Sequence, residues 1–219
     1  MPRRGLTGGV ADVTNFNIMA RQPDSELSER RGYHHGNLRE ALLEAARRLI
    51  AERGPAGFTL SDAAKLAGVS PAAPYRHFKD RQALLKEIAI QGFHQLGERL
   101  GAAARAGGPD GFLAMGRAYL AFAREEPAYY AAMFNTGQTG GAGPKDDPGF
   151  MALEQAVGRA LGVTDPDRIR LAARLVFALT HGLASLSAPG SIAMPGGLAD
   201  PEHLLDVGVA ALLTGLKKA

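Results

Sequence analysis

After Tyr33, apolar residues return every three or four positions and keep this spacing almost to the end of the chain. The spacing places them along one face of a helix, and no stretch shows the sustained alternation that is typical of a strand. Residues 1–32 have neither period and mix Gly, Asn, Ser and Arg, which indicates a mobile arm or, because Met19 can also initiate, a start assigned too early. The pattern predicts an all-α fold that follows an N-terminal arm.

Start and stop residues divide the first helical region. Asn37 is predicted to cap a first helix, with Glu40 completing a capping box, and Gly54 is predicted to end that helix. Thr59 is predicted to cap a second, short helix that stops at Gly68.

A third short helix is expected directly afterwards. Ser70 is its predicted cap and Pro71 its first residue, where the missing N–H costs nothing. Pro74 deletes the first regular hydrogen bond of this helix, so the helix should start in a tightened form. Asp80 is predicted to cap a fourth, longer helix that leads out of the region.

Longer and less charged helices are predicted beyond Gly107. One precedes Pro127, and the others cover 150–161, 166–187 and 201–216; residues 128–134 bring Tyr129, Tyr130, Met133 and Phe134 together. The last two are apolar around much of their circumference, and a chain of this size has few layers in which to bury them. We therefore predict that they form a subunit interface.

Composition narrows the classes of function. The chain has 219 residues, 46% of them hydrophobic, and its lack of cysteine excludes disulfides, a thiol nucleophile and cysteine-ligated metals. No apolar run reaches the roughly 18 residues that cross a bilayer, and no apolar stretch follows Arg3 and Arg4. We expect a soluble, cytoplasmic protein without a membrane partner.

Positive charge is concentrated in one region. Residues 30–86 hold eleven Lys and Arg against five Asp and Glu, a balance of +6, whereas the whole chain carries only +3. The remainder is therefore mildly acidic. This distribution predicts a polyanionic partner for the basic region, with a solvated charged face as the alternative.

The segment 59–78, TLSDAAKLAGVSPAAPYRHF, carries the most informative pattern. Two short helices are joined by a tight turn around Gly68, which should need a positive φ. This is the plan of a helix-turn-helix, whose second helix enters the DNA major groove with its N-terminus first. Small residues open that helix and can approach base edges, donors after Pro74 can reach phosphates, and Phe78 is predicted to anchor the core.

Residues 37–96 resemble the DNA-binding domain of TetR/AcrR-family transcriptional regulators, through "LIAERG", "FTLSDAAKLAGVS" and "YRHFKDRQALL". The resemblance implies DNA-backbone contacts by Tyr75, His77 and Arg81, the last standing where the family usually has lysine. Proline at position 74 also departs from the family. The predicted DNA-contacting residues are Thr59, Ser70, Ala72, Ala73, Tyr75, Arg76, His77, Lys79 and Arg81.

A second resemblance covers the C-terminal half. "EEPAYYAAMF" and "VFALTHGLASL" are similar to a subgroup with a Trp-x-x-x-His-Gly pattern, with Phe177 here in the tryptophan position. It implies an all-helical ligand-binding and dimerisation domain whose last two helices form a four-helix bundle with the partner subunit. The predicted pocket residues are Phe112, Met115, Tyr119, Phe122, Tyr130, Met133, Phe134, Phe177 and His181.

The predicted organisation is an arm (1–32), a helix-turn-helix DNA-binding domain (33–82), a connecting helix (83–106) and a ligand-binding and dimerisation domain (107–219). The predicted function is that of a homodimeric, ligand-responsive repressor. It would bind a near-palindromic duplex operator and respond to an unidentified small molecule. Alternatives are a sequence-tolerant DNA architectural protein, and a helical carrier or enzyme that keeps the helix-turn-helix as a scaffold.

Other chemistry has little support in the sequence. No Gly-x-Ser-x-Gly, phosphate-loop or His-Glu-x-x-His motif is present, so we predict no enzyme and no cofactor. The pair His34-His35 lacks a further ligand at helical spacing, so we predict no metal. His181 on a long apolar helix is interpreted either as a hydrogen-bonded core residue or as a polar group that orients an apolar effector, and most of the aromatic set is core by default.

Overall fold

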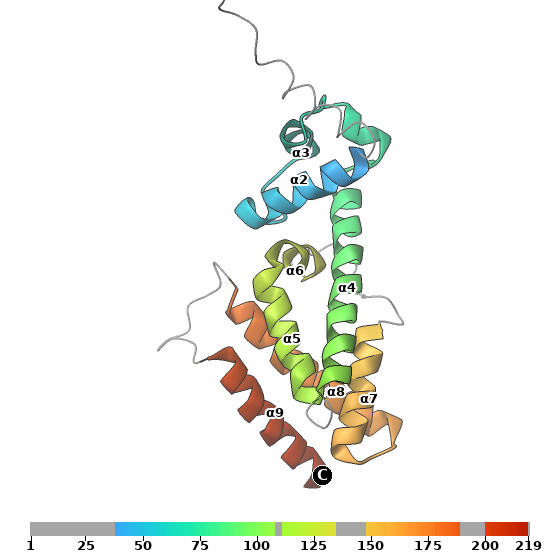
Figure 1. Ribbon diagram of the computed structural model, residues 1–219, viewed down its shortest axis with the longest axis vertical. Helices are drawn as coiled ribbons and strands as arrows, with labels where there is room; N and C mark the ends of the chain where they lie inside the picture. Colours follow the sequence, from blue (N-terminus) through green and yellow to red (C-terminus); the bar gives the residue numbers. More distant parts are fainter. Residues whose placement is uncertain (1–37, 108–110, 135–147, 189–199, 219) are drawn as a thin grey trace, which may run out of the picture. The chain divides into compact units, whose positions relative to one another are not determined.

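The computed structural model describes residues 38–107, 111–134, 148–188 and 200–218, which are helical or connecting, without a strand (Figure 1). This confirms the predicted all-α class. The elements are α2 (Leu38–Arg53), α3 (Leu60–Leu66), the 3₁₀ helix η1 (Ala73–Arg76), α4 (Arg81–Ala106), α5 (Gly111–Glu125), α6 (Pro127–Phe134), α7 (Pro148–Leu161), α8 (Pro166–Leu186) and α9 (Pro201–Lys218). We call residues 38–80 the head and α4 to α9 the body.

Local signals set the boundaries of the head's helices. Gly54 and Gly68 have φ of 74° and 73°, a region that other residues rarely adopt, so both predicted stops are confirmed. The Thr59 hydroxyl accepts from the amide of Asp62 at 3.1 Å, and the Asp62 carboxylate accepts from the amide of Thr59 at 2.8 Å. This is the predicted capping box. The predicted cap Asn37 lies outside the described residues.

The third element differs from its prediction. It is a four-residue 3₁₀ helix whose N-cap is Ala72 and which has no side-chain cap, so Ser70 as cap and Pro71 as first helical residue are wrong. Because Pro74 has no N–H to give to the Ser70 carbonyl, that carbonyl accepts from Ala73 at 3.0 Å instead. The tightened form predicted from Pro74 is confirmed, and it extends through the whole element.

The head closes its core on the beginning of α4. Asp80 caps α4 as predicted, its carboxylate accepting from the amide of Ala83 at 2.8 Å. The core consists of apolar side chains from every element of the head and from the first two turns of α4. Its members include Leu42, Leu43, Leu49, Phe58, Leu60, Pro74, Phe78, Leu84, Leu85 and Ile88.

The body is built around α4, which packs against α5, α6 and α7. Glycine lets two of these helices approach closely: a Cβ added at Gly92 of α4 would lie 2.6 Å from Met133 Sδ of α6. Helix α5 packs in turn against α8 and α9, which also contact each other. Residues of α5 and α6 therefore meet residues of α8 inside the body.

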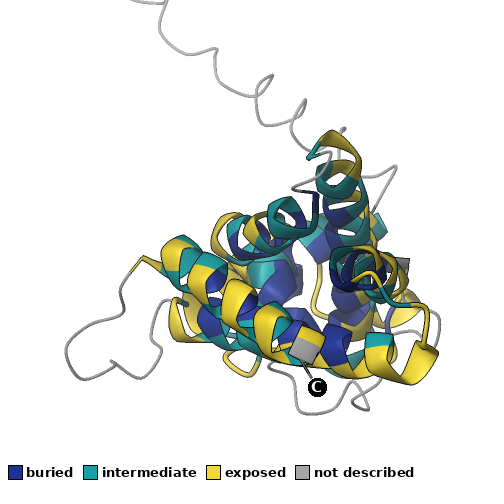
Figure 2. Ribbon diagram, turned by 90° about the horizontal axis from the view of Figure 1, so that it is seen from below, coloured by how far each residue is buried: buried dark blue, intermediate teal, exposed yellow. Residues whose placement is uncertain are grey.

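Helices α8 and α9 begin and end close to their predicted bounds, with Asp165 capping α8. They keep large apolar side chains on the surface, among them Leu171, Leu175 and Val207. Figure 2 shows exposed residues along α9, the helix that ends at the C marker. Among the described helices, α8 alone is long and apolar enough to cross a bilayer, a property shared by core helices of water-soluble proteins. It packs against α5, α7 and α9.

Candidate nucleic-acid interface and aromatic cluster

The recognition segment, which we define as residues 70–79, has an inner and an outer side. Pro74 and Phe78, four residues apart, are buried in the core of the head. The three residues between them, Tyr75, Arg76 and His77, are all exposed, Tyr75 by 60% of its surface. Anchoring on two sides of η1 thus directs three hydrogen-bonding side chains away from the protein. Sequence reasoning predicted the outward donors and the anchor Phe78, but it did not predict the burial of Pro74.

Most other predicted DNA-contacting residues also lie at the surface. Ser70, Ala72 and Lys79 are exposed, and Ala73 is half-buried. Thr59 is exposed, but its hydroxyl donates to Asp62 Oδ2 at 2.7 Å and its amide donates to the same oxygen. A DNA phosphate only accepts hydrogen bonds, so Thr59 can bind one only by giving up a hydrogen bond that it donates to Asp62. These hydrogen bonds from Thr59 lower the pKa of Asp62.

Arg81 has a structural role that the sequence did not indicate. One terminal nitrogen of its guanidinium donates to the carbonyls of Pro55, Ala56 and Phe58, at 3.2, 2.9 and 3.4 Å. These carbonyls belong to the connection between α2 and α3, so Arg81 fixes that connection to the beginning of α4. The phosphate contact predicted for Arg81 stays a prediction.

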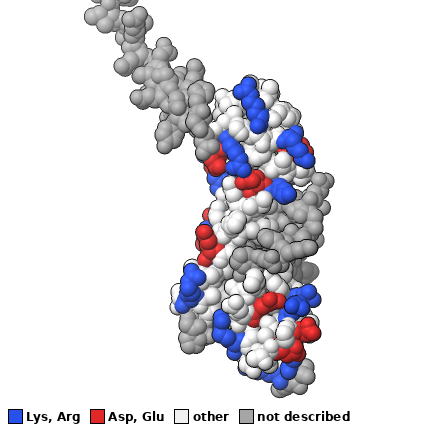
Figure 3. Space-filling model, turned by 90° about the vertical axis from the view of Figure 1, so that its right-hand side faces the viewer, with Lys and Arg blue, Asp and Glu red and all other residues white. Residues whose placement is uncertain are grey.

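Ion pairs divide the cations of the head into two groups. On α2, Arg47 and Arg48 pair with Glu44, and Arg39 pairs with Glu87 of α4. Other cations, in the head and at the beginning of α4, make no ion pair with a described residue; they include Lys65, Arg76, Lys79 and Lys86. In the face drawn in Figure 3, Lys and Arg lie on the head with acidic side chains among them. Positive charge that is not neutralised within the protein is therefore found around the recognition segment.

A cluster of aromatic side chains surrounds His181 in the body. Tyr119 of α5 and Tyr130 of α6 both direct their hydroxyls at His181 Nδ1, at 2.9 and 3.1 Å. Phe177 stacks on the imidazole at 5.5 Å between centroids, and Phe134 approaches it edge-on at 4.7 Å. We call these five residues the aromatic cluster. The hydroxyl of Tyr130 is also 3.0 Å from that of Ser185.

Burial decides the protonation of the aromatic cluster. Desolvation lowers the pKa of His181 and raises the pKa of Tyr130, so both groups are neutral near pH 7. A neutral imidazole carries one N–H, on Nε2 where Nδ1 accepts a tyrosine hydrogen and on Nδ1 where it donates to a tyrosine oxygen. The aromatic cluster thus combines apolar rings with one imidazole N–H donor.

The structure separates the nine predicted pocket residues. Five form the aromatic cluster, whereas Phe112 packs beside Val157 and Leu161 of α7. Phe122 is fully buried, and the guanidinium carbon of Arg99 lies 5.3 Å from the centroid of its ring. Met133 lies against α4 at Gly92, and Met115 is buried. Sequence reasoning missed Ser185, although its position one helical turn after His181 could have indicated it.

Comparison with known proteins assigns the family. Residues 42–88 match the sequence model described as "Bacterial regulatory proteins, tetR family", and residues 112–212 match "Tetracyclin repressor-like, C-terminal domain". An uncharacterized HTH-type transcriptional regulator of Mycobacterium tuberculosis is 31% identical over 155 residues, 69% of this chain and 75% of the relative. The chain belongs to the tetR family. It is an HTH-type, DNA-binding transcriptional regulator.

Two further proteins are similar to this chain. An uncharacterized HTH-type regulator of Bacillus subtilis is 29% identical over 98 residues, 44% of this chain and about half, 51%, of the relative. A solved structure of a protein of unknown function from Rhodococcus is 32% identical, with a TM-score of 0.66 over 84% of this chain and 98% of that one. The family predicted from the helix-turn-helix segment is confirmed, and the subgroup predicted from the His-Gly pattern stays a prediction.

Proposed function

We propose that this tetR-family regulator is a cytoplasmic, homodimeric repressor that binds a near-palindromic operator and is controlled by a small-molecule effector. The observation that carries the proposal is the outward side of the recognition segment, where Tyr75, Arg76 and His77 project from η1 while Pro74 and Phe78 anchor it. A dimer places two such segments in two major grooves. Its half-sites are then related by the two-fold axis of the protein.

The exposed side chains divide into two kinds of DNA contact. Tyr75, His77 and Lys79 carry donors that fit phosphate oxygens, and these contacts position the head without distinguishing sequences. Ala72 and Ala73 are small enough to let the backbone approach base edges, so substitutions there change the preferred sequence. The short 3₁₀ element has little helix dipole, so side chains supply most of the phosphate affinity.

Dimerisation is supported by apolar side chains that one subunit leaves in solvent. Leu171 and Leu175, one turn apart on α8, are 54% and 38% exposed, and Val207 on α9 is 55% exposed. We assign these residues to the subunit interface, because pairing α8 and α9 with their copies removes this surface from water.

The substitution Leu175→Glu would place a charge in the interface and should shift the dimer to monomer, as measured by sedimentation. Met151→Glu on exposed α7 is the control, and an unchanged dimer in Leu175→Glu would contradict the assignment.

The aromatic cluster is the proposed effector site. The rings of Tyr119, Phe134 and Phe177 pack around His181, whose Nε2 is the donor where Nδ1 accepts from a tyrosine hydroxyl. Such a site favours a mostly apolar, uncharged molecule with one hydrogen-bond acceptor. The effector acts by binding two conformations of the dimer with different affinity, and the proposed result is release of the operator.

Selection of bound fragments from random duplex DNA tests the function, because it measures specificity, symmetry and half-site spacing together. Binding of the selected operator is then measured over a salt series; with about four phosphate contacts per half-site, the log–log slope should be roughly −7. Tyr75→Phe should weaken binding to all duplexes alike, and Arg159→Gln on the exposed surface of α7 is the control. Equal affinity for random and selected DNA would favour an architectural protein, and salt-insensitive binding would overturn the proposal.

A further inference from the structure

A cation lies over the C-terminal anchor of the recognition segment. The guanidinium carbon of Arg39, in the first turn of α2, is 5.8 Å from the centroid of the Phe78 ring, and Phe78 itself is buried. Arg39 Nη2 pairs with Glu87 Oε1 of α4 at 2.8 Å. Side chains from α2, from the recognition segment and from α4 therefore meet at Arg39.

The charge of Arg39 is balanced within the protein. Its second terminal nitrogen, Nη1, lies 3.5 Å from Glu40 Oε1, so both ends of the guanidinium face carboxylates. Carboxylate and phosphate oxygens compete for the same donors, so a DNA phosphate would have to replace a carboxylate here. Arg76 and Lys79 of the recognition segment, by contrast, make no ion pair with a described residue. This difference favours a role for Arg39 within the head over a contact with DNA.

The recognition segment depends on its anchors, because its own backbone bonds give little rigidity. The element η1 has four residues and no side-chain cap. The amides of His77 and Phe78 both donate to the carbonyl of Pro74, each at 2.9 Å. A short 3₁₀ helix that ends on one shared carbonyl keeps its shape mainly through the burial of Pro74 and Phe78. A side chain that holds the Phe78 ring in place therefore acts on the whole segment.

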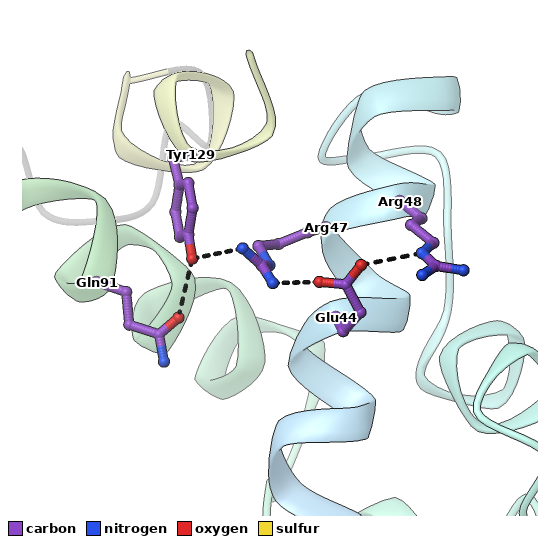
Figure 4. Close-up of polar contacts among 5 residues, drawn as sticks. All are labelled: Glu44, Arg47, Arg48, Gln91 and Tyr129. Carbon is purple, nitrogen blue, oxygen red and sulfur yellow. Dashed lines mark hydrogen bonds and ion pairs between the residues drawn. The ribbon is translucent and has the colours of Figure 1, made fainter. Parts of the chain in front are cut away.

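Two other arginines of α2 are held differently. Arg47 and Arg48 both pair with Glu44 of their own helix, and Arg47 also donates to the hydroxyl of Tyr129 at 2.7 Å (Figure 4). The guanidinium of Arg47 lies over the Tyr129 ring, at 5.0 Å from its centroid. Arg48, with 64% of its side chain exposed, is a cation of the same helix whose ion pair stays within α2. It is the matched control for Arg39.

We propose that Arg39 and Glu87 are positioning residues that fix Phe78, and with it the recognition segment, for the reading of base pairs. The inference rests on the proposed function, since it needs a segment that binds DNA. Phosphate contacts tolerate a mobile segment, whereas contacts to base edges need donors and acceptors in fixed places. Loss of Arg39 therefore lowers the discrimination between operator and random duplex more than it lowers the affinity for random duplex.

The first test follows the recognition segment without DNA. Hydrogen exchange measured by NMR reports how often the bonds of the His77 and Phe78 amides open. Arg39→Gln and Glu87→Gln should each speed exchange at these amides by roughly fivefold, the combined scale of an exposed ion pair and a cation–π contact. The amide of Gly54, which bonds the far end of α2, should keep its parental rate. Faster exchange at all three amides, or at none of them, would overturn the proposal.

The second test compares the affinities for the selected operator and for random duplex of the same length. Arg39→Gln should reduce the ratio of the two affinities by roughly fivefold. Arg48→Gln removes the same charge from the same helix and should weaken both duplexes alike, so that the ratio stays parental. An equal loss for both duplexes in Arg39→Gln would identify a phosphate contact and overturn the positioning role.

Glu87→Gln separates the two roles of Arg39 further. If Arg39 bound phosphate, loss of the carboxylate would free its guanidinium and strengthen binding to both duplexes at an unchanged ratio, which would overturn the proposal. As a positioning residue, Glu87 holds Arg39 over Phe78, so the ratio should fall although the chain becomes more positive. The double variant should lower the ratio no further than Arg39→Gln alone. If the parent chain binds no duplex, the proposed function fails, while the exchange rates still decide whether the pair orders the recognition segment.

Discussion

The head and the body of this regulator use polar contacts of different range in the sequence. In the head, Thr59 and Asp62 are three residues apart, as are the carboxylate of Asp80 and the amide that it caps. In the body, the Tyr119 hydroxyl bonds a histidine 62 residues away, and Arg117 bonds Asp206 across 89 residues.

This difference indicates how the two regions can divide a regulatory task. A contact between residues three apart forms whenever its helix forms, so the boundaries of the head's helices are set by their own neighbours in the sequence. The aromatic cluster exists only while α5, α6 and α8 are packed together. Any change in that packing alters the contacts of the aromatic cluster, as a site for an effector requires.

The largest expected effect comes from the packing of the body. Phe122 has no exposed surface, and Phe122→Ala should lower the free energy of unfolding by about 3–5 kcal/mol, because it leaves a cavity among α4, α5 and their neighbours. Urea denaturation followed by circular dichroism measures this change. Met151→Ala, at an exposed apolar side chain, is the control and should change stability by less than about 0.5 kcal/mol. A loss below about 1 kcal/mol in Phe122→Ala would contradict the importance of this packing.

A smaller effect is expected where the beginning of α4 binds the connection between α2 and α3. Arg81→Lys keeps the charge, but its ammonium ends one bond closer to the backbone than the Arg81 nitrogen that donates to the carbonyls between α2 and α3. We expect stability to fall by about 1–2 kcal/mol, the scale of lost hydrogen bonds to a charged group. Thermal unfolding measures it, with Arg124→Lys on exposed α5 as the control. If stability is unchanged and only DNA affinity falls, Arg81 is a phosphate contact and not a structural tie.

The same difference in range explains what the sequence could predict. The predictions for Thr59, Gly54, Gly68 and Asp80 depend on neighbours within one helical turn, and all four are confirmed. The cap predicted at Ser70 failed for a reason of the same local kind. The sequence showed that Pro74 removes the first hydrogen bond of this helix. Its effect extends over all of η1, which is 3₁₀ throughout, and the Ser70 carbonyl accepts from the amide of Ala73 instead.

Long-range contacts were beyond such reasoning. Tyr119, Tyr130 and His181 were each singled out as pocket candidates, but no local signal shows that both hydroxyls meet one ring nitrogen. Nor did periodicity distinguish these residues from Phe122, which occupies the same kind of apolar position on α5. Only the packing of α5 and α6 against α4 and α8 separates core residues from members of the aromatic cluster.

A still smaller effect is expected for a purely local contact. Thr59→Ala removes the side-chain cap of α3 and should lower stability by about 1 kcal/mol. Ser61→Ala, on the exposed surface of the same helix, is the control, and chemical denaturation measures both. Thr59→Ser keeps the hydroxyl and should restore most of the loss. Without this recovery, the effect of Thr59→Ala would have to be attributed to its methyl group.

The smallest expected change in stability comes from acid, which should affect the body at a higher pH than the head. Burial lowers the pKa of His181 from its ordinary value of 6.5, so as the pH falls through 6.5 the unfolded chain binds a proton that the folded chain does not. The body therefore loses stability in this range. The pKa of Asp62 is lowered from 3.8, so its stabilising contribution in the head persists until the pH falls through 3.8 and below.

Denaturation between pH 7.5 and 5.0 measures this difference. Of the two groups, only His181 has its ordinary pKa, 6.5, within this range; that of Asp62, 3.8, lies below it. In His181→Asn the loss of stability on acidification should be smaller than in the parent chain, whereas His94→Asn, at an exposed histidine of α4, should retain the parental dependence. Equal pH dependence in His181→Asn and the parent would mean that the aromatic cluster accepts a charged imidazole at no cost. The preference for an uncharged effector, which is argued from the same desolvation, would then lose its physical basis.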